Sequence, residues 1–139
     1  MNKTENLTIK ETFALAVQNH QKNNLKVAEN LYKKILKTDP NHASAHNNLG
    51  LVFQAFGEFQ KARSCYEKAI EIQPNFADAY NNLGNVLQEL GDSNEAKICF
   101  EKAIKLNPNF IAAIWNLHQF ALNIDEALII LKKIINIAF

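Results

Sequence analysis

The prolines, glycines and cysteines of this chain all recur with a single period of 34 residues. The prolines are Pro40, Pro74 and Pro108, and the glycines form the pairs Gly50/Gly84 and Gly57/Gly91. The two cysteines, Cys65 and Cys99, follow the same spacing. Because glycine and proline mark turns and helix ends, their common period places the turns of the chain at regular intervals. The sequence therefore predicts a tandem repeat whose units pack on one another.

Between these turns, apolar residues recur at the i, i+3 and i+4 spacing of amphipathic helices. Each 34-residue unit has room for two such helices. The three regular units are predicted at 9–42, 43–76 and 77–110, after a flexible N-terminal segment, 1–8. In each unit a glycine or an asparagine pair supplies the turn between the helices, and the second helix ends before the proline.

The C-terminal unit, 111–139, departs from this pattern. Its first helix is expected over about 111–122, but aligning Ala127 with the alanines of the earlier units shortens the turn by three residues, to 123–125. Asp125 is then expected to cap a last helix that runs to about Ile137.

This last predicted helix is apolar nearly all round, and such a helix favours burial. The terminal unit of a repeat protein normally presents a polar outer face. Two explanations stay open: the native chain continues beyond Phe139, or residues 126–139 pair with a second copy in a homodimer.

Small and aromatic residues recur at fixed places within the units. Counted from the start of the unit, positions 4, 7, 8, 11, 20, 24, 27 and 32 of the third unit are Tyr80, Leu83, Gly84, Leu87, Ala96, Phe100, Ala103 and Pro108. The second unit has His46, Leu49, Gly50, Phe53, Ala62, Tyr66, Ala69 and Pro74. The first unit matches more loosely, and the fourth has His118 at the small eighth position.

This pattern resembles the tetratricopeptide repeat family. The resemblance implies an all-α fold, a right-handed α-solenoid of antiparallel helix-turn-helix hairpins, with a tetratricopeptide domain over 9–139. Small residues at positions 8 and 20 let the helices of a hairpin approach closely, and the aromatic residue at position 24 fills the space toward the next hairpin. The N-N-L-G and P-N-F signatures are most similar to the repeats of protein O-linked N-acetylglucosamine transferases.

The resemblance also implies a ligand-binding concave groove lined by the first helix of each hairpin. The groove residues carried over are Asn47, Asn48, Leu51, Gln54, Asp78, Asn81, Asn82, Asn85, Gln88, Trp115, Asn116 and Gln119. Asn48, Asn82 and Asn116 share the sixth position, and a carboxamide can pair with both the N–H and the C=O of an extended peptide. The alternative is that these asparagines bond to neighbouring helices or to water.

Trp115, the single tryptophan, falls on a groove position. Large aromatic side chains often anchor binding surfaces. The alternative is that Trp115 packs against the displaced last helix. A further mode of the family, a clamp of cationic side chains for the C-terminal carboxylate of chaperones, is set aside because neither possible frame supplies a cation and Asp78 would repel a carboxylate.

Composition and motifs favour binding over chemistry. A formal net charge of +1 gives no reason to expect a nucleic acid or a membrane as partner. His42 and His46 are four residues apart but have no third ligand at suitable spacing, so no metal and no cofactor are expected. No catalytic residues are identified, and two unpaired cysteines one repeat apart suit the reducing cytoplasm.

We therefore expect a non-catalytic protein–protein interaction scaffold whose groove receives an extended peptide or a partner helix. Two alternatives remain. In the first, the chain is the substrate-recruiting arm of a larger glycosyl- or other group transferase. In the second, it is a self-assembly unit built through its apolar C-terminal helix.

Overall fold

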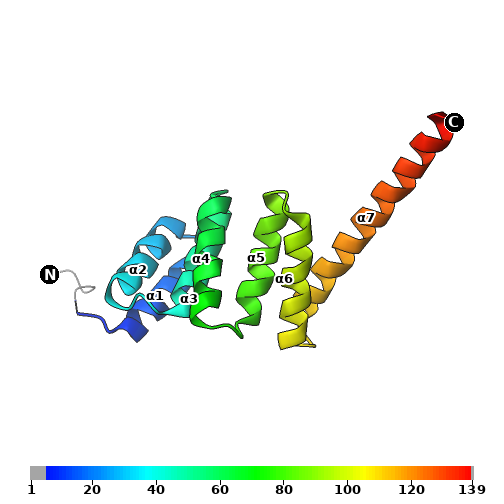
Figure 1. Ribbon diagram of the computed structural model, residues 1–139. Helices are drawn as coiled ribbons and strands as arrows, with labels where there is room; N and C mark the ends of the chain where they lie inside the picture. The colour runs from blue at the N-terminus through cyan, green and yellow to red at the C-terminus, as the bar shows by residue number, and fades with distance from the viewer. Residues whose placement is uncertain (1–5, 139) are drawn as a thin grey trace.

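The computed structural model describes residues 6–138, apart from the side chains at 130, 134, 137 and 138, and over this range the chain forms seven α-helices and no strand. The helices are α1 (Ile9–Gln21), α2 (Leu25–Thr38), α3 (Ala43–Ala55), α4 (Phe59–Ile72), α5 (Ala77–Glu89), α6 (Ser93–Leu106) and α7 (Ile111–Ala138). The first six form three antiparallel hairpins that stand side by side, and α7 follows the third (Figure 1).

The turns inside the hairpins use a left-handed backbone conformation at one repeat position. Gly57 and Gly91 have φ angles of 75° and 85°, and Asn23 adopts φ 62° at the corresponding place in the first hairpin. Glycine reaches this region without steric cost, and asparagine tolerates it better than most residues. The asparagine pair that interrupts the first unit therefore replaces the glycine turn, as the sequence predicts.

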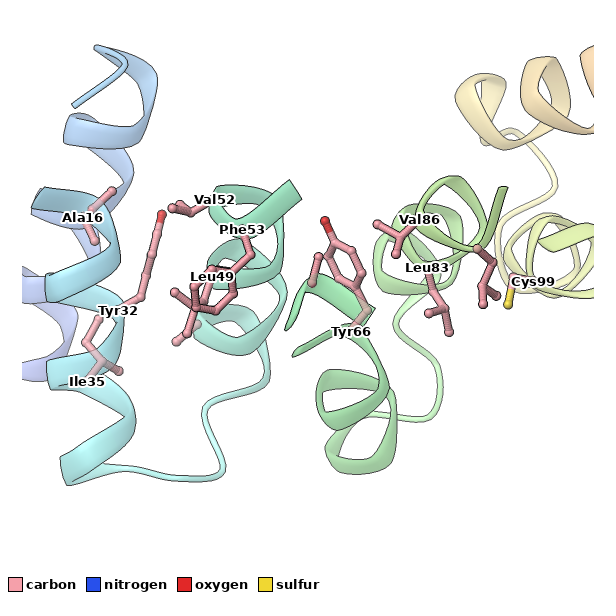
Figure 2. Packing of buried hydrophobic residues seen from close by; sticks show 14 of the residues in the cluster. Ala16, Tyr32, Ile35, Leu49, Val52, Phe53, Tyr66, Leu83, Val86 and Cys99 are labelled. Carbon is pink, nitrogen blue, oxygen red and sulfur yellow. The ribbon is translucent and has the colours of Figure 1, made fainter. Parts of the chain in front are cut away.

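Close contact between the two helices of a hairpin depends on the glycine at position 8. A Cβ atom built on Gly50 would lie 2.6 Å from Tyr66 Cε1, and one built on Gly84 would lie 2.5 Å from Phe100 Cε1. Both aromatic rings are completely buried, and Leu49 is 5% exposed. Figure 2 shows Tyr66 of the second hairpin on the side toward Leu83 and Val86 of the third. The core is therefore shared along the stack, as expected for units that fold only together.

The boundary at the N-terminus lies earlier than predicted. Thr8 caps α1 in a capping box: its hydroxyl accepts the N–H of Glu11, and the Glu11 carboxylate accepts the N–H of Thr8. Such a box pairs backbone donors that the first turn of a helix leaves open. Thr8 therefore belongs to the folded unit, while 1–5 of the predicted flexible segment lie outside the described residues.

The prediction of a fourth hairpin is wrong for the described residues. In place of a turn at 123–125 and a new helix capped by Asp125, α7 continues without interruption for 28 residues. The connections in the second and third hairpins are three residues long, 56–58 and 90–92. The shortening seen in the sequence therefore removes the whole connection, and no glycine or proline remains to end the helix. No described helix combines the length and hydropathy needed to cross a membrane.

Candidate binding face

The first helices of the hairpins, α3 and α5, and the beginning of α7 carry the predicted groove residues, and we call this surface the amide face. Asn48, Leu51, Gln54, Asn82, Asn85, Gln88, Asn116 and Gln119 are half-buried there. Asp78 and Trp115 are exposed. Asn47 and Asn81 are only 5% and 6% exposed, so these two lie beneath the surface rather than on it.

The asparagines of successive repeats are joined by hydrogen bonds. Asn82 Nδ2 donates to Asn47 Oδ1 at 3.1 Å, and Asn116 Nδ2 donates to Asn81 Oδ1 at 2.9 Å. In each case the sixth position of one repeat bonds to the fifth position of the repeat before it. These bonds give a partner to the buried side-chain oxygens at the fifth position, which would destabilise the fold if they were left without a hydrogen bond. We call this arrangement the amide ladder.

The ladder has an aromatic residue at each end. Phe13 occupies the fifth position in the first repeat, so Asn48 has no asparagine to reach and donates to the Tyr32 hydroxyl at a longer 3.4 Å. Trp115 occupies the fifth position in the last repeat and is 61% exposed. Because α7 runs straight on, no returning helix covers this indole, and the alternative that Trp115 packs against a displaced last helix is wrong for the described residues.

Two asparagine side chains of the ladder retain hydrogen-bonding capacity. Asn82 Oδ1 and Asn116 Oδ1 accept no hydrogen bond from any residue in the range 6–138, and each Nδ2 uses one of its two hydrogens. Asn48 differs, because its Oδ1 accepts from Asn47 Nδ2 at 3.4 Å. The ladder therefore holds two carboxamides in fixed orientations while leaving one donor and one acceptor on each unpaired within the described chain.

The second hairpin contains a polar contact that the sequence analysis missed. The Tyr66 hydroxyl donates to Gln54 Oε1 at 2.8 Å, which orients the Gln54 amide on the amide face. Burial raises the pKa of Tyr66 well above its usual range, so the hydroxyl remains a donor. The third repeat has Phe100 at the same position, and Gln88 has no such partner among the described residues. The combination of glutamine at position 12 with tyrosine at position 24 is the signal that would have revealed the contact.

The charges on the amide face are acidic. Asp78 is exposed on α5, as is Glu89 next to the groove residue Gln88, and none of the groove residues named above is cationic. The buried Glu29, also missed from the sequence, lies elsewhere on α2, where Lys26 donates to its carboxylate at 2.6 Å and Lys33 is 3.6 Å away. The hydrogen bond from Lys26 lowers the pKa of Glu29 below its usual value.

The two candidate histidines serve the backbone near the start of α3. His42 Nδ1 accepts the N–H of Ala45 at 3.0 Å, which caps the helix, and His46 Nε2 lies 2.8 Å from the Pro40 carbonyl oxygen. Within the part of the chain that the structure describes, no three His, Cys, Asp or Glu side chains are grouped closely enough to hold a metal ion.

Both cysteines are free thiols on the second helices, and they contribute to packing. Cys99 is buried on α6, and Cys65 is half-buried against the core on α4. Burial raises the pKa of each thiol to about 11. Both side chains are therefore protonated, and poor nucleophiles, at neutral pH.

Comparison with known proteins agrees with this architecture. The sequence matches the family model described as tetratricopeptide repeat over residues 13–75 and again over 42–109. The structure of MamA is similar, with a TM-score of 0.80, 26% sequence identity, and coverage of 96% of this chain and 80% of the MamA chain. Comparison with curated protein sequences gives no significant match.

Two further structures share the fold at lower identity. The Sgt2 tetratricopeptide domain from Aspergillus fumigatus has a TM-score of 0.80 at 23% identity, covering 86% of this chain and 80% of its own. The first such domain of Spaghetti (RPAP3), bound to the HSP90 peptide SRMEEVD, has a TM-score of 0.80 at 20% identity, covering 84% and 93%. These likenesses confirm the predicted right-handed α-solenoid of antiparallel hairpins. The chain belongs to the tetratricopeptide repeat family.

Proposed function

We propose that this chain is an interaction module that binds an extended polypeptide along the amide face, on the concave side of the solenoid. The observation that carries the proposal is the state of Asn82 and Asn116. Each carboxamide is fixed by the ladder and keeps an unpaired acceptor and an unpaired N–H among residues 6–138. A backbone amide of a ligand offers the complementary donor and acceptor. Fixed side chains lose little entropy on binding, which favours affinity.

The spacing of the repeats suits an extended ligand. Packed helices lie about 8–10 Å apart, and an extended chain rises about 3.3 Å per residue. Successive asparagines at the sixth position would therefore meet the ligand backbone about once every three residues. Contacts of this kind bind the backbone of the ligand and depend little on its side chains, so we expect broad specificity.

The charge of the face limits the class of ligand. Asp78 and Glu89 are exposed on it, and its groove residues include no cation, so we expect a neutral or basic polypeptide. The HSP90 peptide held by the similar RPAP3 domain is acidic in its last residues, SRMEEVD. An acidic tail of that kind would be repelled here. Trp115 is the proposed anchor for one end of the ligand, since its indole is 61% exposed at the edge of the face.

The proposed role is binding, without catalysis, in the cytoplasm. The face consists mainly of carboxamides, which are neither acids nor bases near neutral pH and are not nucleophiles. Free thiols at Cys65 and Cys99 suit a reducing compartment.

The single tryptophan makes the proposal testable without a known ligand. A library of unstructured peptides, neutral, basic and acidic, is titrated against the full chain while Trp115 emission is followed. We expect neutral or basic peptides to shift the emission to shorter wavelength as they cover the indole. For the best peptide, Asn82→Ala with Asn116→Ala should weaken binding about tenfold to thirtyfold, from two lost hydrogen bonds of about 1 kcal/mol each. The matched control is Asn30→Ala, an exposed asparagine on α2.

A second probe leaves the protein unchanged. Methylation of single backbone nitrogens in the best peptide removes one N–H at a time. We expect the binding affinity to fall when the methyl group is at about every third residue. Replacement of the peptide side chains by alanine should matter less. If the double asparagine variant, shown by circular dichroism to be folded at the assay temperature, binds every peptide as tightly as the original chain, the amide face is not the binding site.

A further inference from the structure

The apolar stripe by which α7 packs on the hairpins does not end where the hairpins end. Ala113 is fully buried and Phe120 is 6% exposed on the part of α7 that contacts α5 and α6. The stripe then continues through four side chains that are 43% to 52% exposed, namely Ile124, Leu128, Leu131 and Ile135. Figure 1 shows this half of α7 projecting beyond the other helices.

The spacing of the stripe is that of a coiled-coil seam. The steps between successive members alternate between four and three residues along Leu117, Ala121, Ile124, Leu128, Leu131 and Ile135. This alternation is the a/d pattern of a heptad, which presents a narrow apolar seam to a second helix. Leu122 and Ile129 are also exposed but lie on the opposite side of α7, so they are outside the seam.

The charges beside the seam specify the direction of a partner. Asp125 and Lys132 occupy the same flanking position in successive heptads, whereas Glu126 and Lys133 lie on the far side of α7 with Leu122 and Ile129. Asp125 and Lys132 are exposed, and neither forms an ion pair with any other described residue. A second, antiparallel copy of α7 would bring its Lys132 against this Asp125, whereas a parallel copy would set equal charges at the same level. Charges flanking a seam select orientation in this way.

The structure also has space for the end of a partner helix. One hollow, of about 470 Å³, lies between α7 and the neighbouring ends of α5 and α6, and a second, of about 300 Å³, lies between α7 and α6. Both are lined by Phe120 and Ile124. A helix that lies along the exposed seam toward the hairpins would enter this space. The self-complementary charges and the room beside Ile124 together indicate that the occupant is another copy of the same chain.

We infer that a second copy of this chain covers the seam, forming a two-fold symmetric, antiparallel pair of α7 helices centred near residue 129. Ile124 of one copy lies near Ile135 of the other, and Asp125 of each copy faces Lys132 of its partner. The overlap is about a dozen residues a side, against the roughly 20–30 of a standard interface. The dimer is therefore reversible and concentration-dependent.

Sedimentation of the full chain from roughly 1 µM to 1 mM, the range of weak and moderate affinities, tests the pairing. We expect the mean mass to rise from monomer toward dimer, and not beyond it. Leu128→Gln with Leu131→Gln should raise the dissociation constant by at least about tenfold, because each dimer loses four leucine side chains from the seam, two from each copy. The matched control is Leu122→Gln with Ile129→Gln, which alters two equally exposed residues outside the seam and should leave the constant unchanged.

The charges are tested by reversal. Asp125→Lys leaves only basic charges beside the seam, and Lys132→Glu leaves only acidic ones. Each variant should be monomeric alone, and an equimolar mixture should form a one-to-one dimer. Raising the salt concentration should weaken the original dimer, because the antiparallel contacts are attractive and exposed charges are screened.

Orientation is measured directly with a spin label at Ile111→Cys, an 80% exposed position. The antiparallel pair places the two labels about 50 Å apart along the helix axes, whereas a parallel pair places them within about 10–15 Å. A chain that stays monomeric throughout the series overturns the inference, as does dimerisation unaffected by the Leu128 and Leu131 substitutions. Monomers that bind vesicles of phosphatidylcholine and phosphatidylserine would assign the seam to a membrane surface instead.

Discussion

The contact between Gly84 and Phe100 makes a quantitative prediction about what holds a hairpin together. Replacing Gly84 with alanine adds one methyl group, whose carbon would lie 2.5, 2.8 and 2.9 Å from three atoms of the Phe100 ring. Ordinary contact requires a separation about 1 Å larger. The ring is completely buried, so it has no free space to move into. Either α5 and α6 separate or the ring leaves its preferred rotamer.

Two opposing terms set the size of the effect. Overpacking a core by one or more carbons costs about 1–3 kcal/mol. Alanine in place of glycine inside a helix returns up to about 1 kcal/mol through backbone entropy. We therefore expect Gly84→Ala to lower the free energy of unfolding by about 1 kcal/mol, and Gly84→Leu by more, since the larger side chain meets the same ring. Urea denaturation followed by circular dichroism measures both values.

The cause can be separated from a general sensitivity to mutation. Phe100→Leu alone opens a cavity and destabilises the chain. The double variant Gly84→Ala with Phe100→Leu should lose less stability than the sum of the two single variants, because the smaller side chain makes room for the added methyl group. We expect a coupling energy above about 0.5 kcal/mol. Gly91→Ala is the matched control: its Cβ meets nothing within 4 Å, but a φ angle of 85° strains alanine. That cost should be unaffected by Phe100→Leu. If Gly84→Ala is as stable as the original chain, or if its loss adds independently to that of Phe100→Leu, the steric argument is wrong.

Three further predictions concern ionisation and hydrogen bonding. The pKa of Cys65 and of Cys99 is raised from 9.0 to about 11, so the unfolded chain loses these protons first, and the free energy of unfolding should fall as pH rises from about 9 to 11. Substituting both with alanine should flatten that part of the profile. The pKa of Glu29 is lowered, chiefly by the hydrogen bond from Lys26. The stabilising contribution of Glu29 is therefore present above pH 4.5 and is lost as pH falls through the lowered pKa. Glu29→Gln should remove this dependence on acid pH, as measured by urea denaturation at a series of pH values. Tyr66→Phe removes one hydrogen bond and should cost about 1 kcal/mol, and an unchanged midpoint of denaturation would show that the bond contributes nothing.

The hairpins could be predicted because their determinants are local. Turns at Asn23, Gly57 and Gly91 depend on what each residue's own backbone can adopt, and a helix end before a proline depends on two neighbouring residues. The small residues at Gly50 and Gly84 are needed wherever two helices touch, so their spacing predicts the contact. Such signals repeat with the sequence, and a period of 34 residues makes them easy to recognise.

The last unit differs from the prediction because a helix continues unless a turn, a glycine or a proline ends it. The sequence retains the apolar pattern of a second helix after Asp125, which suggested a hairpin. Pattern alone does not show whether two helical stretches are separate. The missing connection of three residues allowed α7 to continue, and this leaves its second half uncovered.

The sequence by itself determined the repeat, the hairpins and the residues eligible to face a ligand. Only the tertiary structure decided which of those residues reach the surface. Asn47 and Asn82 are neighbours in the amide ladder although 35 residues separate them in the chain, and Asn47 is buried where α3 meets α5. A pattern of adjacent asparagines gives each the same chemistry, but hydrogen bonding across repeats makes one an internal acceptor and leaves the other with an unpaired donor and acceptor within the described chain.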